Sequence, residues 1–454
     1  MVGVLLPLHC LAGDLVYNLS TPKMTDPFQL PAFHFPKGFL WGSSTAAHQI
    51  EGNNIHSNFW AKEQRGGIWS QWDIDEPSGI ACNHWELFRE DVALLARLGH
   101  QVYRFSIEWS RLEPVEGEWN EEAFRHYEEL IDLLVQNGIK PMVTLHHFTH
   151  PLWFEEKGEF NKVENLPCFY RFVEKLAPRI HDRVFAWNVF NEFNRGGYYG
   201  CPRKLQILKA HAHVYRYLKS LSPAPVSTAH ALSHFFPCRQ YDPFDQTMVR
   251  FLDHITNEFF FHAIRTGEFV YPDMDAVEVP GLKGALDFWA INYYNREMVD
   301  SRKAGAMGER YPHVRVRMID KPFYLEEFYA EGLTQSLQRF TDLPVYITEN
   351  GCSANDDRFR IVYLAEHLSA IHEAIRLGVE VKGYIYWSTL DNYEWGSYKP
   401  RFGLVDVDRA TLARTPKPSA GFFRELIEAN GFTQEILRRY LKEIPTSNFT
   451  NPTR

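Results

Sequence analysis

The stretch Leu343-Pro-Val-Tyr-Ile-Thr-Glu-Asn-Gly351 decides the fold prediction, because it joins a buried strand to an acid at the strand's end. Its residues Val345 to Thr348 are β-branched or aromatic, which is typical of a fully buried strand. Asn350-Gly351 is a turn signal, so we expect Glu349 to lie where the strand stops. Taken alone, the stretch fits a surface glutamate before a loop equally well.

A second stretch has the same form. The apolar run Val184 to Phe190 ends in Asn191-Glu192, and the glycine-rich Arg195-Gly196-Gly197 follows. Two strands therefore each deliver a glutamate to a loop. This repetition favours a functional position for both Glu192 and Glu349.

Short apolar runs alternate with amphipathic helical stretches along the chain. Residues 121–136, for example, carry apolar side chains at helical spacing and end at Asn137-Gly138, a helix stop. The expected strands cover residues 39–43, 102–106, 140–145, 184–190, 226–230, 287–292, 345–348 and 382–387. The expected helices cover residues 84–98, 121–136, 169–180, 205–221, 248–265, 326–340, 359–377 and 420–428.

Eight strands that alternate with helices predict the α/β class, as a (β/α)8 TIM barrel in a single domain with long βα loops. A Rossmann sheet would also carry G-x-G-x-x-G after the first strand, and the sequence has none there. We expect residues 33–435 to form the catalytic barrel, residues 1–32 a poorly ordered extension, and residues 436–454 a tail.

Composition excludes several classes of protein. The 454 residues carry a net charge of −9, which argues against a nucleic-acid binder. The six cysteines form no C-x-x-C pair, so neither a zinc site nor a disulfide framework is indicated. No apolar run approaches the roughly 20 residues of a membrane span.

The N-terminal segment Met1 to Lys23 contains an apolar patch at Val2 to Leu11, with no basic residue before it. A secretory signal normally has that basic flank, so we interpret the segment as an extension. We therefore expect a cytoplasmic protein, with secretion as the alternative.

Barrel geometry predicts how the two acids face each other. With about 4.8 Å between strands, the Cα atoms of the fourth and seventh strand ends lie roughly 14 Å apart. The side chains then leave on the order of 6 Å between carboxyl carbons, closer to the about 5–5.5 Å of retaining glycosidases than to the about 6.5–9.5 Å of inverting ones.

The pair needs different protonation states to work as acid and nucleophile. Arg104, at the end of the second strand, can hold one carboxylate ionised, and the hydroxyls of Tyr293-Tyr294 can donate to it. Glu192 lies between aromatic neighbours, with Arg195 as the one evident cation, so we expect it to be the protonated acid. A core ion pair between Arg104 and a glutamate is the structural alternative.

Several segments resemble the signature segments of glycoside hydrolase family 1, in the correct order between Phe33 and Glu428. They are residues 39–52, 103–111, 191–192, 292–294, 347–351 and 387–395. The resemblance implies a retaining β-glycosidase, foremost a β-glucosidase, with β-galactosidase or β-fucosidase activity possible. It implies no cofactor and no metal, and small β-glycosides or short β-linked oligosaccharides as partners rather than nucleic acid or membrane.

The resemblance also implies roles for individual residues. Glu349 is the nucleophile, Glu192 the acid/base, and Arg104 and Tyr294 support the nucleophile. The implied substrate-binding residues are Gln49, His147, Asn191, Asn292, Tyr294, Trp387, Glu394, Trp395 and Phe402. Trp387 offers a stacking floor, and Gln49 and Glu394 can bind adjacent sugar hydroxyls.

Three departures from the family pattern stand out: Phe193 replaces the usual proline after the acid/base, His146-His147-Phe148 replaces Phe-His-Trp, and Ser110 replaces a frequent proline. They leave open the loop geometry near Glu192, and with it the choice of aglycone. The histidines at 146, 147 and 150 have no evident carboxylate partner, so we expect hydrogen bonding rather than a metal site.

Three other functions stay open. A transglycosylase shares the first half-reaction, and a non-catalytic sugar-binding homologue typically lacks one acid. A 6-phospho-β-glycosidase carries a small hydroxyl residue and a basic partner where Glu394-Trp395-Gly396 stands, and the anionic Glu394 disfavours it.

Overall fold

The computed structural model describes residues 26–65, 67–69, 72–73, 76–195, 201–272, 274–303 and 329–445. Parallel strands close into an eight-stranded barrel, in the order β12-β14-β15-β2-β5-β6-β7-β8. The predicted (β/α)8 barrel is thereby confirmed. The barrel strands are β2 (Leu40–Ser44), β5 (Val102–Ser106), β6 (Lys140–His146), β7 (Ala186–Asn191), β8 (Val226–Ala231), β12 (Trp289–Asn292), β14 (Val345–Glu349) and β15 (Val381–Trp387).

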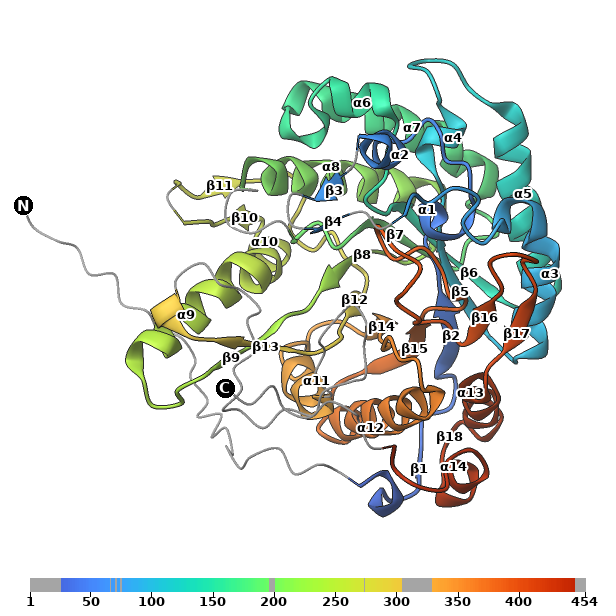
Figure 1. Cartoon of the computed structure of the whole chain (residues 1–454). Helices are drawn as coiled ribbons and strands as arrows, with labels where there is room; N and C mark the ends of the chain where they lie inside the picture. Colours follow the sequence, from blue (N-terminus) through green and yellow to red (C-terminus); the bar gives the residue numbers. More distant parts are fainter. Residues whose placement is uncertain are drawn as a thin grey trace, which may run out of the picture.

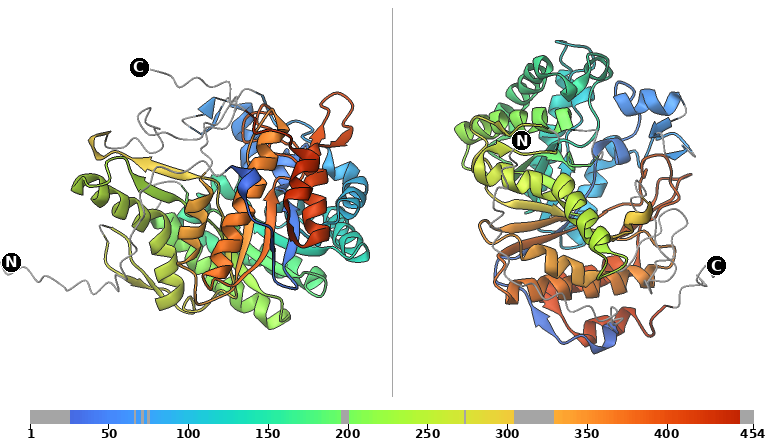
Figure 2. Two further views of the ribbon diagram at one scale, coloured as in Figure 1. Left: turned by 90° about the horizontal axis from the view of Figure 1, so that it is seen from below. Right: turned by 90° about the vertical axis from the view of Figure 1, so that its left-hand side faces the viewer.

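Helices surround the strands on the outside of the barrel (Figure 1, Figure 2). Each barrel strand is followed along the chain by one main helix, as the alternation of periodicities predicts. These helices are α3 (His84–Arg97), α5 (Glu121–Gln136), α7 (Leu166–Ile180), α8 (Cys201–Leu221), α10 (Phe259–Thr266), α11 (Ala330–Leu337), α12 (Asp357–Arg376) and α13 (Pro418–Ala429).

Two expected helices differ from those found. The single helix expected over 248–265 is broken into α9 (Pro243–Asp253), a π-helical turn (His254–Glu258) and α10. Its start also lies earlier, because the Asp242 side chain accepts hydrogen bonds from the first turn. The start of the helix expected over 326–340 lies outside the described residues.

Shorter elements fill the loops. Two-stranded pairs join β9 to β13, β16 to β17, β3 to β4 and β10 to β11. Their bounds are β3 (Gly67–Trp69), β4 (Trp72–Asp73), β9 (His234–Pro237), β10 (Glu268–Phe269), β11 (Val277–Glu278), β13 (Arg296–Val299), β16 (Val405–Val407) and β17 (Arg414–Pro416). The short helices are α1 (Ala47–Ile50), α2 (Asn58–Gln64), α4 (Trp109–Leu112) and α6 (Leu152–Glu156).

The packed part of the chain extends beyond both expected boundaries. β1 (Phe33–His34) pairs with β18 (Gly431–Phe432), and α14 (Gln434–Tyr440) follows with Ile436 and Leu437 buried. The Gln434 amide donates hydrogen bonds to two carbonyls in the 27–30 segment, where Leu30 is buried. The segment expected as a tail from 436 thus continues a helix, and Pro27 and Leu30 are buried within the expected N-terminal extension. Residues 1–25 lie outside the described part.

Polar residues are buried where the barrel strands end. An apolar cluster occupies the barrel interior, formed by Val102, Met142, Ala186, Ala229, Phe288, Ala290 and Ile385. By contrast, the last residues of many strands are buried and polar: Ser44, Ser106, His146, Asn191, Asn292 and Glu349. The carboxyl ends of TIM-barrel strands carry the active site, so this mouth is where chemistry is expected.

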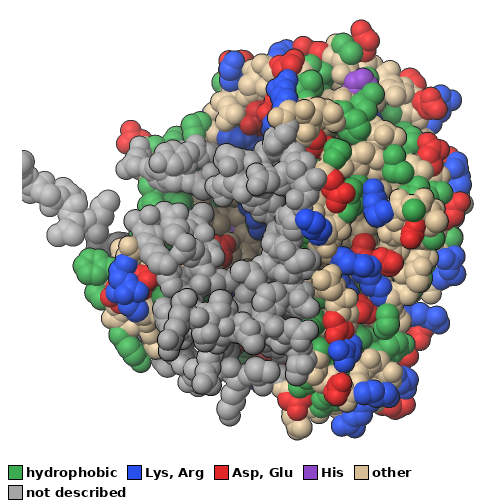
Figure 3. All heavy atoms as spheres, viewed as in Figure 1, with side chains coloured by type: hydrophobic (Ala, Val, Ile, Leu, Met, Phe, Trp, Pro, Cys, Tyr) green, Lys and Arg blue, Asp and Glu red, His purple; other side chains and the backbone are tan. Residues whose placement is uncertain are grey.

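The surface seen in Figure 3 intermixes Lys and Arg with Asp and Glu over its described part. Among the helices that the structure describes, none combines the length and apolar character that crossing a bilayer requires.

Candidate active site

Glu349 is the last residue of β14, and its side chain is buried at the barrel mouth. One carboxylate oxygen pairs with the guanidinium of Arg104, and the other accepts the hydroxyl of Tyr294 at 2.7 Å. After the strand, the backbone at Gly351 packs directly against the backbone of Trp387. A Cβ at this position would lie 1.8 Å from the carbonyl oxygen of Trp387, so a residue with a side chain does not fit. The predicted turn signal thus marks a close backbone approach.

Glu192 directly follows β7, and only 7% of the residue is exposed. Its φ of +48° lies in the left-handed region, which is strained for a residue with a Cβ. Oε1 accepts a hydrogen bond from Asn292 Nδ2 at 3.0 Å, and Oε2 pairs with Arg195 Nε at 2.8 Å. Both carboxylate oxygens are therefore held by N–H donors.

One polar network joins the two acids. Arg104 donates to Asn191 Oδ1 at 2.6 Å as well as to Glu349. Asn292 Nδ2 donates to the same Asn191 oxygen at 3.1 Å and to Glu192. The pairing between β12 and β14 shifts register by one residue. As a result, Asn292 pairs with Glu349 and not with the residue that precedes Glu349. Bulges of this kind re-aim side chains near active sites.

Burial raises the pKa of Glu349 to about 7, and the negative charge of Glu192 adds to the rise. The charge of Arg104 and the hydrogen bonds from Tyr294 and Arg104 oppose it. Arg104 favours the ionised form of Glu349, the role that the sequence suggested for it, but it does not cancel the rise in pKa. Loss of water outweighs the cation, because a buried carboxylate forfeits its solvation.

The other predicted substrate-binding residues form a wall next to the acids. Gln49 donates through Nε2 to Asn392 Oδ1 at 3.0 Å and to the Tyr393 carbonyl at 2.9 Å, and its buried Oε1 has no partner among the described residues. Trp387 donates its indole N–H to Glu394 Oε1 at 3.1 Å. The wall therefore presents an acceptor, a carboxylate and a ring face.

His147 links this wall to the acids. Its ring stacks on Trp387 and on Trp395, with centroids 6.0 and 6.1 Å away. His147 Nε2 accepts from Asn191 Nδ2 at 3.1 Å, since Oδ1 of that amide already accepts from Arg104. Burial and the nearby guanidinium hold the pKa of His147 well below its usual value, so the ring is neutral.

Phe402 completes the group. It packs with Ala46 and Trp387 in a small buried cluster, and Tyr294 lies edge-on to it at 6.2 Å. The structure thus gathers the assigned substrate-binding residues beside the two acids. The hydroxyl of Tyr293, which the sequence also offered as a donor to a carboxylate, donates instead to the carbonyl of Tyr329 at 2.6 Å.

The histidines next to His147 have a carboxylate partner that the sequence did not indicate. His150 Nε2 lies 2.8 Å from Glu155 Oε2, so a carboxylate partner exists, five residues away on α6. His146 and His150 hydrogen-bond to each other at 3.1 Å. These side chains form a hydrogen-bonded chain, as expected, although the stated absence of a carboxylate was wrong.

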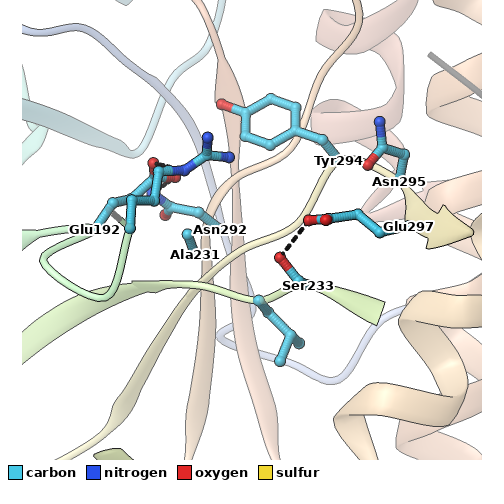
Figure 4. Close-up of a pocket in the computed structure, with 9 residues that line it drawn as sticks. Glu192, Ala231, Ser233, Asn292, Tyr294, Asn295 and Glu297 are labelled. Atoms are coloured by element: carbon cyan, nitrogen blue, oxygen red, sulfur yellow. Dashed lines mark hydrogen bonds and ion pairs between the residues drawn. The ribbon is translucent and has the colours of Figure 1, made fainter. Parts of the chain in front are cut away.

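Sequence reasoning missed a polar pocket that adjoins Glu192 (Figure 4). The residues that it overlooked there are Ser233, Asn295 and Glu297. The signal was present, since Asn295 and Glu297 follow closely on Tyr294, a residue already assigned to the site.

Phe193, which replaces the family's usual proline, anchors the loop that carries Glu192. Its side chain is buried, and its ring packs against Phe259 and Phe260.

The chain is similar to known glycosidases in sequence and in overall structure. A beta-glycosidase from Pyrococcus horikoshii has a similar solved structure, with a TM-score of 0.82 and 35% identity over 90% of this chain and 98% of that chain. Beta-glucosidase A of Thermotoga maritima is 28% identical over 87% of this chain and 98% of its own. The 6-phospho-beta-glucosidase GmuD of Bacillus subtilis is also 28% identical, over 88% and 99%.

Overall sequence identity therefore does not tell whether the substrate is a glucoside or a glucoside 6-phosphate. The residues of the site have to distinguish the two substrates. The family assignment itself covers nearly the whole barrel, since residues 32–201 and 202–432 match Glycosyl hydrolase family 1. The chain belongs to glycosyl hydrolase family 1.

Proposed function

We propose that this chain is a retaining β-glycosidase and, within that class, a β-glucosidase. It removes terminal non-reducing β-D-glucosyl residues from small glycosides and short β-linked oligosaccharides, with β-galactosides and β-fucosides as further substrates. Membership of the family supports the class, and the beta-glucosidase among the relatives supports the sugar. The observation that carries the proposal is one buried network that joins the carboxyls of Glu192 and Glu349.

In the first half-reaction, Glu349 attacks the anomeric carbon while Glu192 gives its proton to the leaving oxygen. The glycosidic C–O bond breaks, the aglycone leaves as an alcohol, and a glycosyl ester forms on Glu349. In the second half, the Glu192 carboxylate takes a proton from water, and the water oxygen attacks the anomeric carbon. Ester cleavage returns the Glu349 carboxylate to its partners Arg104 and Tyr294.

The wall residues provide sugar recognition in this proposal. The unsatisfied Oε1 of Gln49 accepts a hydroxyl of the bound sugar, and Glu394 accepts from a neighbouring hydroxyl. Trp387 packs against the apolar face of the ring. A buried polar site of this kind rejects analogues that lack the hydroxyl, because its own groups would stay unpaired.

Two alternatives can be weighed on the same residues. The buried carboxylate of Glu394 would repel a sugar phosphate, which disfavours the 6-phospho substrate. A non-catalytic role is disfavoured because both acids are in place. Transglycosylation shares the glycosyl-enzyme, so product analysis with an alcohol acceptor distinguishes it.

The experiment is hydrolysis of a panel of nitrophenyl β-D-glycosides, including glucoside 6-phosphate. We expect the glucoside to be cleaved best. Glu349→Gly should lose turnover, and azide should restore it on an activated aryl glucoside by replacing the missing nucleophile. The exposed Glu86→Gly is the control that stays active. Activity near wild type in Glu349→Gly, or preference for the phosphate, would overturn the proposal.

We also propose a cytoplasmic location. It is supported by the free thiols of Cys82, Cys168 and Cys238, since reduced cysteines are typical of that compartment. Fractionation of the native host cells tests it.

A further inference from the structure

The pocket beside Glu192 adjoins the position that a leaving group has to occupy. A general acid must contact the leaving oxygen, so the space next to its carboxyl receives the departing alcohol. Besides Glu192, Asn292 and Tyr294, the pocket is lined by Arg195, Ala231, Leu232, Ser233, Asn295 and Glu297. Figure 4 shows Glu192 and Glu297 on opposite sides of it.

Glu297 is fixed in this position. It lies on β13, which pairs in parallel with β9, so that Glu297 stands opposite Phe235. Ser233 donates its hydroxyl to Oε1 of Glu297 at 2.8 Å, the interaction drawn in Figure 4. Within the described part of the chain, Oε2 accepts no hydrogen bond. The carboxylate is therefore oriented by one partner, with an acceptor left over for a ligand.

Apart from Ala231 and Leu232, the other lining residues carry polar groups as well. Arg195 pairs with Glu192, and its charge also interacts with Glu297. Asn295 is half-buried, and its side-chain amide makes no hydrogen bond to the described residues. Tyr294 contributes the single aromatic ring among the residues that line the pocket. A flat aryl alcohol would strip water from these groups without replacing its hydrogen bonds.

We propose that Glu297 is a specificity-determining residue that selects a hydroxylated leaving group, namely a second sugar unit. Its Oε2 accepts a hydrogen bond from a hydroxyl of that sugar, and Asn295 adds a donor and an acceptor beside it. The inference rests on the proposed function and extends it from the transferred sugar to the departing one.

The test compares kcat/KM for cellobiose and for 4-nitrophenyl β-D-glucoside in the wild type and in Glu297→Leu. Both substrates form the same glycosyl-enzyme, so they differ in the leaving group alone. A hydrogen bond to a charged acceptor corresponds to a loss of about 10- to 100-fold for cellobiose. The value for the nitrophenyl substrate should stay within about twofold. Ser233→Ala should give a smaller loss in the same direction, and the exposed Glu86→Leu none.

Equal losses on both substrates, or no loss on either, would overturn the inference. So would a wild-type enzyme that cleaves the nitrophenyl glucoside but not cellobiose. If the wild type cleaves no nitrophenyl glycoside, the proposed function fails instead. Retained nitrophenyl activity shows that the variant is folded; should Glu297→Leu not fold, Glu297→Gln carries the comparison with the same expected direction.

Discussion

Tyr294 donates its hydroxyl to Oε2 of Glu349 across 2.7 Å, on the side of the carboxylate opposite Arg104. Loss of water and the charge of Glu349 raise the pKa of Tyr294 well above its usual value, so the phenol keeps its proton. The bond stabilises the ionised form of a carboxyl whose pKa burial raises to about 7. The two donors, Tyr294 and Arg104, therefore oppose the effect of burial on the pKa. They help to keep the candidate nucleophile Glu349 ionised near neutral pH.

Removing this donor should shift the pH profile. In the wild type, kcat/KM should fall below about pH 7 as Glu349 takes up a proton. Tyr294→Phe loses a hydrogen bond to a charged group, about 1.5–3 kcal/mol, which moves this acid limb up by about one to two pH units. The measurement is kcat/KM on a nitrophenyl glucoside against pH. Tyr241→Phe, at a site 86% exposed, is the control, and an unmoved acid limb in Tyr294→Phe would contradict the argument.

Arg104→Met should destabilise the fold in a pH-dependent way. Breaking a buried pair typically costs about 3–5 kcal/mol of the free energy of unfolding. Without the cation, the pKa of Glu349 rises further above its unfolded value, so the folded state binds a proton that the unfolded state has released. Stability is then lost as pH rises. Denaturant unfolding should show a larger deficit near pH 8 than near pH 6.

The control for that measurement is Arg97→Met on the exposed side of α3, which should change little at either pH. A deficit in Arg104→Met that is the same at both pH values would mean that Glu349 does not exchange a proton over this range.

Glu192→Gln should reduce kcat/KM most for substrates whose leaving group needs a proton from a general acid. General acid catalysis contributes about 10²–10⁴-fold, so kcat/KM for poor leaving groups should drop by that order. A dinitrophenyl glucoside leaves without a proton, and its first step should change little. A burst experiment separates the two half-reactions, with Glu86→Gln as the matched control. Uniform loss across leaving groups would argue for a structural role of Glu192.

Phe193→Ala should destabilise the loop that carries Glu192. The ring is 4% exposed, with centroids 5.9 and 5.2 Å from Phe259 and Phe260. Truncating a buried Phe costs about 3–5 kcal/mol. Thermal unfolding checks the stability, and kcat/KM should fall as Glu192 loses its fixed position. Phe244→Ala, at a site 73% exposed, should leave both unchanged, and similar results for the two variants would refute the anchoring role.

Local signals were sufficient for much of the fold. The expected strand 102–106 and helix 121–136 agree with β5 and α5 to the residue. For the helix, the apolar periodicity and the stop signal Asn137-Gly138 are adjacent in the sequence, so both its type and its end could be predicted. The break between α9 and α10 was missed, since a π-helical turn adds a residue per turn without changing the apolar character of the segment.

By itself, the sequence determined that two strands each lead to a glutamate, that eight strands alternate with helices, and which residues resemble a sugar site. Only the tertiary structure decided that Asn292 stands opposite Glu349, that Glu297 faces Glu192 across a pocket, and that desolvation outweighs Arg104. The reason is physical. Periodicity reports on neighbours along the chain, whereas strand register, burial and charge interactions arise when the barrel closes and brings distant segments together.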